Sequence, residues 1–168
     1  MRSRLLVSIF AFTLTGVIAS CTDEITALDR NFEDNATWQA TLAAEVAGAP
    51  ATATGRAWFV DRGSRIDYYI EYSGLSTNAT NAHLHLTVGG GIYVQVQFVR
   101  QQSGVVVGSF DTSPGVTDVS PQPPGTPGQA GTQTVAEFRN LLDTGGLYVN
   151  VHSEQFGGGE IRGTVNRR

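Results

Sequence analysis

From Ala36 onward the sequence alternates apolar and polar residues with a period of two, the spacing of a β-strand with one buried face. In TWQATLAA (37–44), Trp38, Ala40 and Leu42 share one face. The stretch 55–75 has the pattern of a hairpin, with a DRGS turn in which Gly63 can adopt a positive φ. The same alternation recurs at 82–86, 92–99, 104–110, 147–153 and 160–165. Seven to eight short strands predict an all-β fold, an antiparallel sandwich or barrel.

Two segments between the predicted strands lack this alternation. Residues 112–133 contain five of the six prolines, which excludes a strand and predicts a long loop. One short helix is expected at about 134–143, because Thr134 and Glu137 match a capping box and Gly145 can end the helix. Its apolar stripe consists of Val135, Phe138, Leu141 and Leu142.

The first residues predict export. Two arginines precede the apolar run LLVSIFAFTLTGVI, which is too short to span a bilayer but suits the core of a signal peptide. The following IASC resembles the lipobox of bacterial lipoproteins. That resemblance implies a signal peptide at 1–20, a lipid on Cys21, a tether at 21–35, and an exported protein anchored to a membrane of the cell envelope or at the cell surface. The alternative is an ordinary signal peptide with an incidental cysteine, but Cys21 is the only cysteine in the chain.

Charge and motif content exclude several classes of function. A net charge of −4 argues against nucleic-acid binding, which requires a basic surface. No serine lies in a G-x-S-x-G motif, and neither glycine run, at 89–91 or 157–159, opens a helix that could hold a phosphate. We therefore expect no enzymatic activity of these kinds.

Three ordered segments resemble the CHRD domain, which is named for chordin and is common in exported bacterial proteins. They are ATGRAWF (53–59), YSGLSTNATNAHLHL (72–86) and LYVNVHSEQFGGGEIRGTV (147–165). The resemblance implies a Greek-key β-sandwich over residues 36–168 and a non-catalytic binding or structural module. It names neither a protein partner nor a small-molecule ligand. Nothing in the chain resembles the growth-factor-binding domains that accompany the module in chordin.

The parity of the strands places the three histidines on non-core faces. In AHLHL, His83 and His85 point away from the side of Leu84, and in LYVNVHS, His152 shares the polar face with Asn150. In GEIRGTV, Glu160 and Arg162 fall on the corresponding face. If these strands are neighbours, their polar side chains should form one outer patch.

This patch has two interpretations. His83, His85 and His152 could bind a metal ion, Cu or Zn, with Asn150, Glu160 and Arg162 as supporting groups around the ligands. Copper–zinc superoxide dismutase is similar in carrying a His-x-His strand on the outside of a Greek-key barrel. This chain differs because it has no paired cysteines and only three histidines. The alternative is a structural cluster in which the histidines are hydrogen-bonded to carboxylates and carbonyls.

Overall fold

The computed structural model describes residues 21–114 and 134–168, and side chains from residue 26 onward within these ranges. The strands are β1 (Trp38–Ala44), β2 (Thr54–Asp61), β3 (Arg65–Ser73), β4 (Ala79–Leu86), β5 (Ile92–Gln95), β6 (Gly104–Asp111), β7 (Leu147–Ser153), β8 (Ile161–Thr164) and β9 (Asn166–Arg167), and the helices are α1 (Cys21–Asn35) and α2 (Val135–Thr144). This content confirms the predicted all-β class. Most of the predicted 112–133 loop lies outside the described residues.

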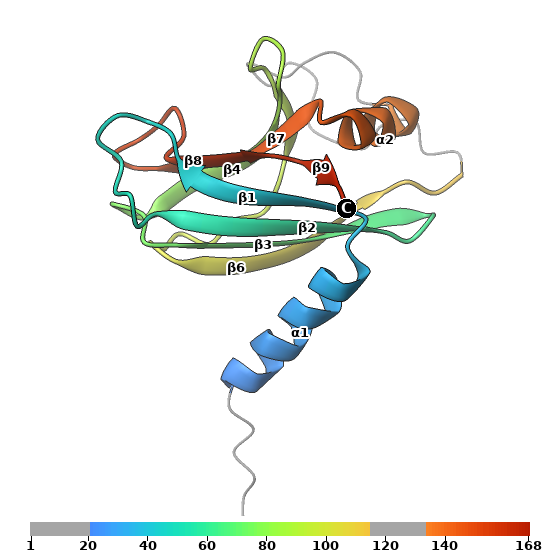
Figure 1. Cartoon of the computed structure of the whole chain (residues 1–168), viewed down its shortest axis with the longest axis horizontal. Helices are drawn as coiled ribbons and strands as arrows, with labels where there is room; N and C mark the ends of the chain where they lie inside the picture. Colours follow the sequence, from blue (N-terminus) through green and yellow to red (C-terminus); the bar gives the residue numbers. More distant parts are fainter. Residues whose placement is uncertain (1–20, 115–133) are drawn as a thin grey trace, which may run out of the picture.

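The strands form one antiparallel sheet in the order β5-β4-β7-β8-β1-β2-β3-β6, with β9 paired to β1. The sheet curls so that β4, β5, β7 and β8 face β1, β2, β3 and β6 across the core (Figure 1). Because β3 pairs with β6 and β4 with β7, the chain passes repeatedly between the two halves, as expected for a Greek-key arrangement.

The β2–β3 hairpin follows directly from the sequence. Its register pairs Phe59 with Tyr68, and Gly63 in the connecting turn has a φ of 80°. In β1, buried and exposed residues alternate, and Trp38, Ala40 and Leu42 are all buried. The predicted parity of these strands is therefore confirmed.

Helix α2 closes one end of the core. The side chain of Thr134 accepts a hydrogen bond from the backbone N–H of Glu137, and Gly145 ends the helix in the left-handed conformation. Phe138 is fully buried and stacks on Tyr93 with ring centroids 5.9 Å apart. The predicted capping and the apolar stripe are confirmed, and the helix lies one residue later in the chain than expected.

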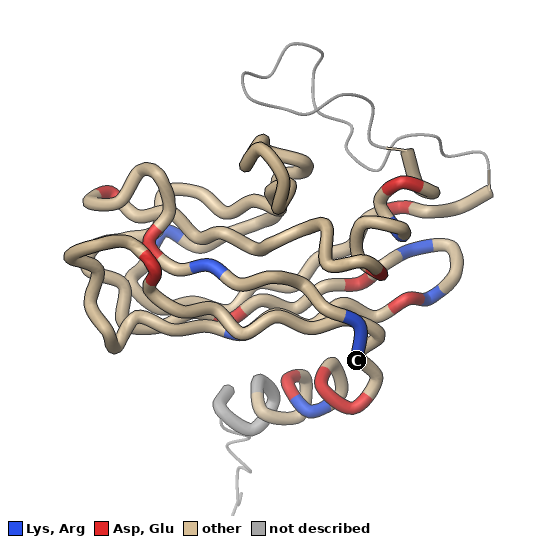
Figure 2. The backbone as a smooth tube through the Cα atoms, turned by 45° about the horizontal axis from the view of Figure 1, so that its top comes forward, with Lys and Arg blue, Asp and Glu red and all other residues tan. Residues whose placement is uncertain are grey.

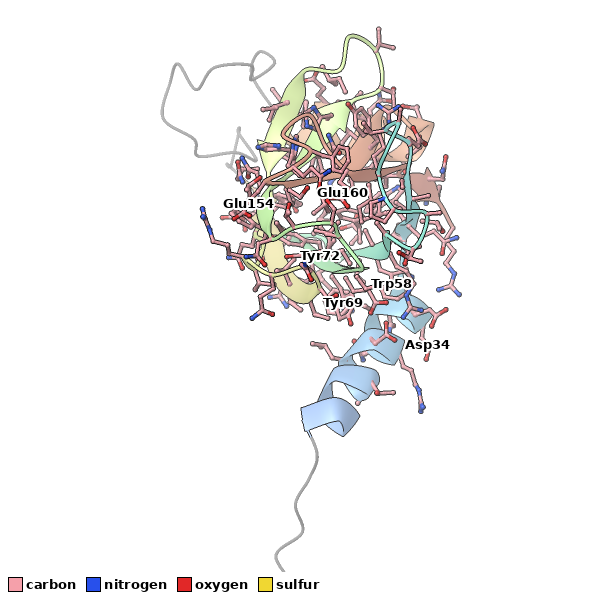
Figure 3. All side chains as sticks on the ribbon, turned by 90° about the vertical axis from the view of Figure 1, so that its left-hand side faces the viewer. Asp34, Trp58, Tyr69, Tyr72, Glu154 and Glu160 are labelled. Carbon is pink, nitrogen blue, oxygen red and sulfur yellow. The ribbon has the colours of Figure 1, made fainter. Side chains whose placement is uncertain are left out.

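Helix α1 differs from the prediction, because the sequence patterns indicate one helix, at about 134–143, and a tether without secondary structure at 21–35. Its last turns lie against β2 and β3 (Figure 1), where Phe32 is buried and packs on Tyr69 at a centroid distance of 5.6 Å. Trp58 and Tyr69 lie on the surface of the sheet that faces this helix (Figure 3). Asp29 also pairs with Arg56 at 3.4 Å. The spacing of Leu28 and Phe32 was the available signal for a helix.

No helix in the described part of the chain combines the length and apolar character needed to cross a bilayer.

Candidate metal centre

The pairing of β4 with β7 brings the three histidines of the chain together. The register places His83 opposite Asn150 and Asn81 opposite His152, so His152 lies diagonally from His83 on the same face of the sheet. Nδ1 of His83 is 3.0 Å from Nε2 of His152. One ring nitrogen from each histidine lies within 4.8 Å of the other two. An ion with bonds of about 2.0–2.1 Å could contact all three after small side-chain movements.

The histidine cluster, defined as His83, His85 and His152, is buried. These residues are only 5%, 7% and 7% exposed, respectively. The expectation of an outer patch is therefore wrong, although the cluster does lie on the sheet face opposite the core. The reason is that the β4–β5 and β7–β8 loops fold over this face and engage the rings through the carbonyls of Gly90 and Gly157.

Those two carbonyls determine where the protons of two rings lie. Nδ1 of His85 is 2.9 Å from the Gly90 oxygen, and Nδ1 of His152 is 2.9 Å from the Gly157 oxygen. A carbonyl oxygen can only accept a hydrogen bond, so Nδ1 carries the proton in both rings and Nε2 keeps a free lone pair. Nε2 of His152 accepts from Nδ1 of His83. Among the described residues, Nε2 of His85 is buried without a hydrogen-bond partner.

The electrostatics of the cluster favour neutral rings. The pKa of His83 is lowered to about 4, mainly by burial and in addition by the neighbouring His152 and His85, while a hydrogen bond to Gln95 acts in the opposite direction. Burial also lowers the pKa of His85 and of His152, against the effect of their carbonyl partners. At neutral pH all three rings are therefore uncharged, which is the form that binds metal.

Asn150 lies next to the cluster, as parity predicted. It is 3% exposed, and its Nδ2 donates to the Gly158 carbonyl at 3.2 Å. Its Oδ1 is buried and has no partner within the described residues. A Cβ on Gly159 would overlap the Asn150 amide, and Gly159 has a φ of 109°, so only glycine fits where this loop crosses the face.

Glu160 was predicted to be a supporting group around the ligands, but its hydrogen bonds go to Ser76 and Ser153 instead. It is fully buried inside the fold, unlike the exposed Glu154 (Figure 3). One oxygen accepts from the backbone N–H of Ser76 at 2.7 Å, and the other accepts from the hydroxyls of Ser76 and Ser153. The residue precedes β8, where strand parity no longer fixes the direction of the side chain. Glu160 therefore links β7 to the segment before β4.

Arg162 contacts the cluster only through another ring. It forms an ion pair with Glu45, and its guanidinium lies 5.7 Å from the centroid of Tyr148. Tyr148 in turn stacks on His85, with centroids 5.1 Å apart and planes 15° apart. Although Glu160 is only two residues away, the carboxylate that pairs with Arg162 belongs to Glu45.

Sequence reasoning missed three kinds of group around the cluster. Tyr148 had the correct parity but was given no role, and Gln95 was only one polar position in an alternating strand. The carbonyls of Gly90 and Gly157 belong to glycine runs interpreted as tight loops. The available signal is that Gly90 and Gly157 each lie five residues beyond a histidine. A short reversal of the chain brings such a carbonyl back to the ring.

The arrangement offers three neutral nitrogen donors in a small, buried space. Imidazole donors suit Zn and Cu, whereas Mg and Ca require oxygen ligands. Hydrogen bonds from the distal ring nitrogens to backbone carbonyls are the usual supports of histidine ligands. The residues therefore fit a transition-metal ion.

A comparison with protein-family models matches the CHRD domain to residues 38–165, which cover every strand that carries the cluster. No curated protein and no solved structure gives a match. The matched segment takes up most of the sequence and includes the three segments that resembled this domain. The chain therefore belongs to the CHRD domain family.

Proposed function

We propose that this CHRD domain binds one transition-metal ion, Cu or Zn, through His83, His85 and His152. The observation that carries the proposal is the convergence of three buried ring nitrogens within 4.8 Å of one another. Hydrogen bonds to backbone carbonyls keep the protons of His85 and His152 on Nδ1, so that Nε2 of both rings has a lone pair for an ion. Nε2 of His85 has no partner among the described residues, and at His152 the ion would replace the hydrogen bond from Nδ1 of His83, whose proton would move to its own Nε2. A purely structural cluster would have no need for the unpartnered Nε2 of His85.

His152→Ala should lower metal affinity by more than about 100-fold, because loss of even a supporting residue costs about 10–100-fold. Titration of the chelator-treated full chain with Zn²⁺ or copper, followed by elemental analysis, measures both affinity and stoichiometry. Wild-type protein should take up one equivalent. Gln155→Ala is the matched control, because Gln155 is exposed in the neighbouring loop. Equal uptake by wild-type protein and His152→Ala would contradict the proposal.

We further propose that the domain is an exported module held at the bacterial cell envelope by a lipid on Cys21. The signal-peptide pattern of residues 1–20 and the single cysteine at the end of IASC support this location. The role is binding rather than catalysis, because the loops over the cluster leave its rings 7% exposed or less and give a substrate little access.

Cys21→Ser should move the protein from the membrane fraction to the soluble exported fraction, because a thioether-linked lipid requires the sulfur. Cell fractionation with immunodetection measures the distribution, and incorporation of labelled fatty acid measures lipidation directly. Ser20→Ala serves as the control, because it retains a small residue before the cysteine. The lipid anchor would be excluded if Cys21→Ser stayed in the membrane fraction and the wild-type protein incorporated no labelled fatty acid.

A further inference from the structure

Within the part of the chain that the structure describes, the histidine cluster contains and contacts only uncharged groups, and this limits which ion it can stabilise. We propose that the cluster selects the monovalent ion Cu⁺ over the divalent ions Zn²⁺ and Cu²⁺. This inference rests on the proposed metal-binding function and makes it more specific, because the sequence and the cluster's position leave both metals open.

The ligands and their supports supply no negative charge. The rings are neutral, and their named contacts are the carbonyls of Gly90 and Gly157, the side chain of Gln95 and the ring of Tyr148. Sites for Zn²⁺ commonly include a thiolate or carboxylate ligand, or a carboxylate that accepts from the distal nitrogen of a histidine. A divalent ion here would therefore keep its full charge of two.

The surroundings are also free of charge over a long stretch of chain. Residues 72–99, which include β4 and β5, and residues 144–153, which include β7, contain no Asp, Glu, Lys or Arg (Figure 2). The carboxylate of Glu160 is occupied by Ser76 and Ser153. The Tyr148 ring, which stacks on His85, has the Arg162 guanidinium on it. The positive charge of this guanidinium opposes the binding of a cation.

Burial makes this absence of negative charge decisive. The free energy of moving an ion out of water rises with the square of its charge, so a divalent ion loses about four times the hydration free energy of a monovalent ion of equal size. With rings 5–7% exposed, little solvent remains to offset that loss. Neutral donors in a buried space therefore favour the ion with the smaller charge.

The number and spacing of the donors agree with this choice. A trigonal ion with bonds near 2.0 Å needs nitrogens about 3.5 Å apart. The separations here run from 3.0 Å up to 4.8 Å, so small movements of the rings would provide that geometry. Cu⁺ accepts three nitrogen ligands, whereas Zn²⁺ takes a fourth, usually water in sites with three protein ligands. The loops over the cluster limit access for that fourth ligand.

Competitive titration of the full chain tests the selection. Cu⁺ is supplied anaerobically with a chromophoric chelator of known affinity, and Zn²⁺ and Cu²⁺ are titrated against their own chelators. Cu⁺ should bind at least about 100-fold more tightly than either divalent ion. Against Cu²⁺, that preference places the reduction potential of the bound ion about 120 mV above the aqueous couple, at 59 mV per tenfold. His152→Ala should weaken the binding of every ion by more than about 100-fold.

Two other outcomes separate the inference from the function on which it rests. If Zn²⁺ or Cu²⁺ binds as tightly as Cu⁺ and His152→Ala abolishes that binding, the metal site stands and the selection is wrong. If no ion binds, or if binding survives loss of His152, both the metal site and its selectivity are overturned.

A charge variant tests the cause of the selection. Asn150 lies opposite His83 and two residues before His152, so Asn150→Asp adds one carboxylate beside the cluster without a change in size. Zn²⁺ should gain at least about tenfold in affinity relative to Cu⁺, because attraction to the added charge is twice as strong for a divalent ion. Asn150→Ser removes the amide without adding charge and should keep the original preference. An unchanged Zn²⁺-to-Cu⁺ ratio in Asn150→Asp would overturn the electrostatic explanation.

Discussion

Gly163→Ala is expected to destabilise the fold by at least about 3 kcal/mol, because the site has no space for a methyl group. A Cβ at Gly163 would overlap the backbone carbonyl of Thr41 and press on the side chain of Leu42. Relief requires β8 to separate from β1, and this contact joins the two halves of the sheet. Urea unfolding followed by tryptophan fluorescence measures the change, since Trp38 and Trp58 are both buried.

Gly158→Ala is the matched control within the same segment. A Cβ at Gly158 meets no atom within 4 Å, so its free energy of unfolding should change by less than about 0.5 kcal/mol. Similar losses in the two variants would show that the contact with Thr41 does not explain the result.

The second large effect is loss of stability in mild acid when no metal is bound. The pKa of His83 falls from an ordinary value of 6.5 to about 4 on folding. Above pH 6.5 the ring is neutral in both the folded and the unfolded chain and has no effect on pH dependence. Between pH 6.5 and 4 only the unfolded chain takes up the proton. The free energy of unfolding therefore decreases as the pH is lowered through this range, by about 3 kcal/mol in total for this group. His85 and His152 add losses of the same sign.

Chelator-treated protein, unfolded with urea between pH 7.5 and 4.5, provides the measurement. The triple variant His83→Gln, His85→Gln and His152→Gln separates the histidines from the carboxylates, which titrate in part of the same range. Its stability should depend less on pH than that of the wild type between pH 6.5 and 5. Parallel curves for the two proteins would mean that the histidines are already charged in the fold or contribute nothing.

The sequence predicted those helices and strands whose structure is determined by residues that are close together in the chain. The β2–β3 hairpin follows from alternation and from Gly63, and α2 follows from Thr134 and Gly145. These signals are reliable because the residues that satisfy the backbone at a turn or a cap are neighbours in sequence.

The surroundings of the histidine cluster could not be predicted in the same way. Parity identifies the face on which His83 and His152 lie, but it does not show whether solvent or a loop covers that face. The covering depends on the carbonyl directions of Gly90 and Gly157, which no side-chain pattern specifies. Parity also failed at Glu160, which precedes β8 and turns toward Ser76 and Ser153. For α1, packing of Phe32 on Tyr69 supplies tertiary support that an acidic segment does not reveal by itself.

The pairing of β4 with β7 ties occupancy of the proposed site to completion of the fold. His83 and His152 are 69 residues apart in sequence, so an unfolded chain presents only the local pair of His83 and His85. A chain exported unfolded would therefore acquire its ion after export, once β4 and β7 had paired. The bound ion would then stabilise a domain that has no disulfides. It would add about 2.7 kcal/mol to the free energy of unfolding when the free ion concentration is 100 times the dissociation constant. Metal content would thereby report which molecules have finished folding.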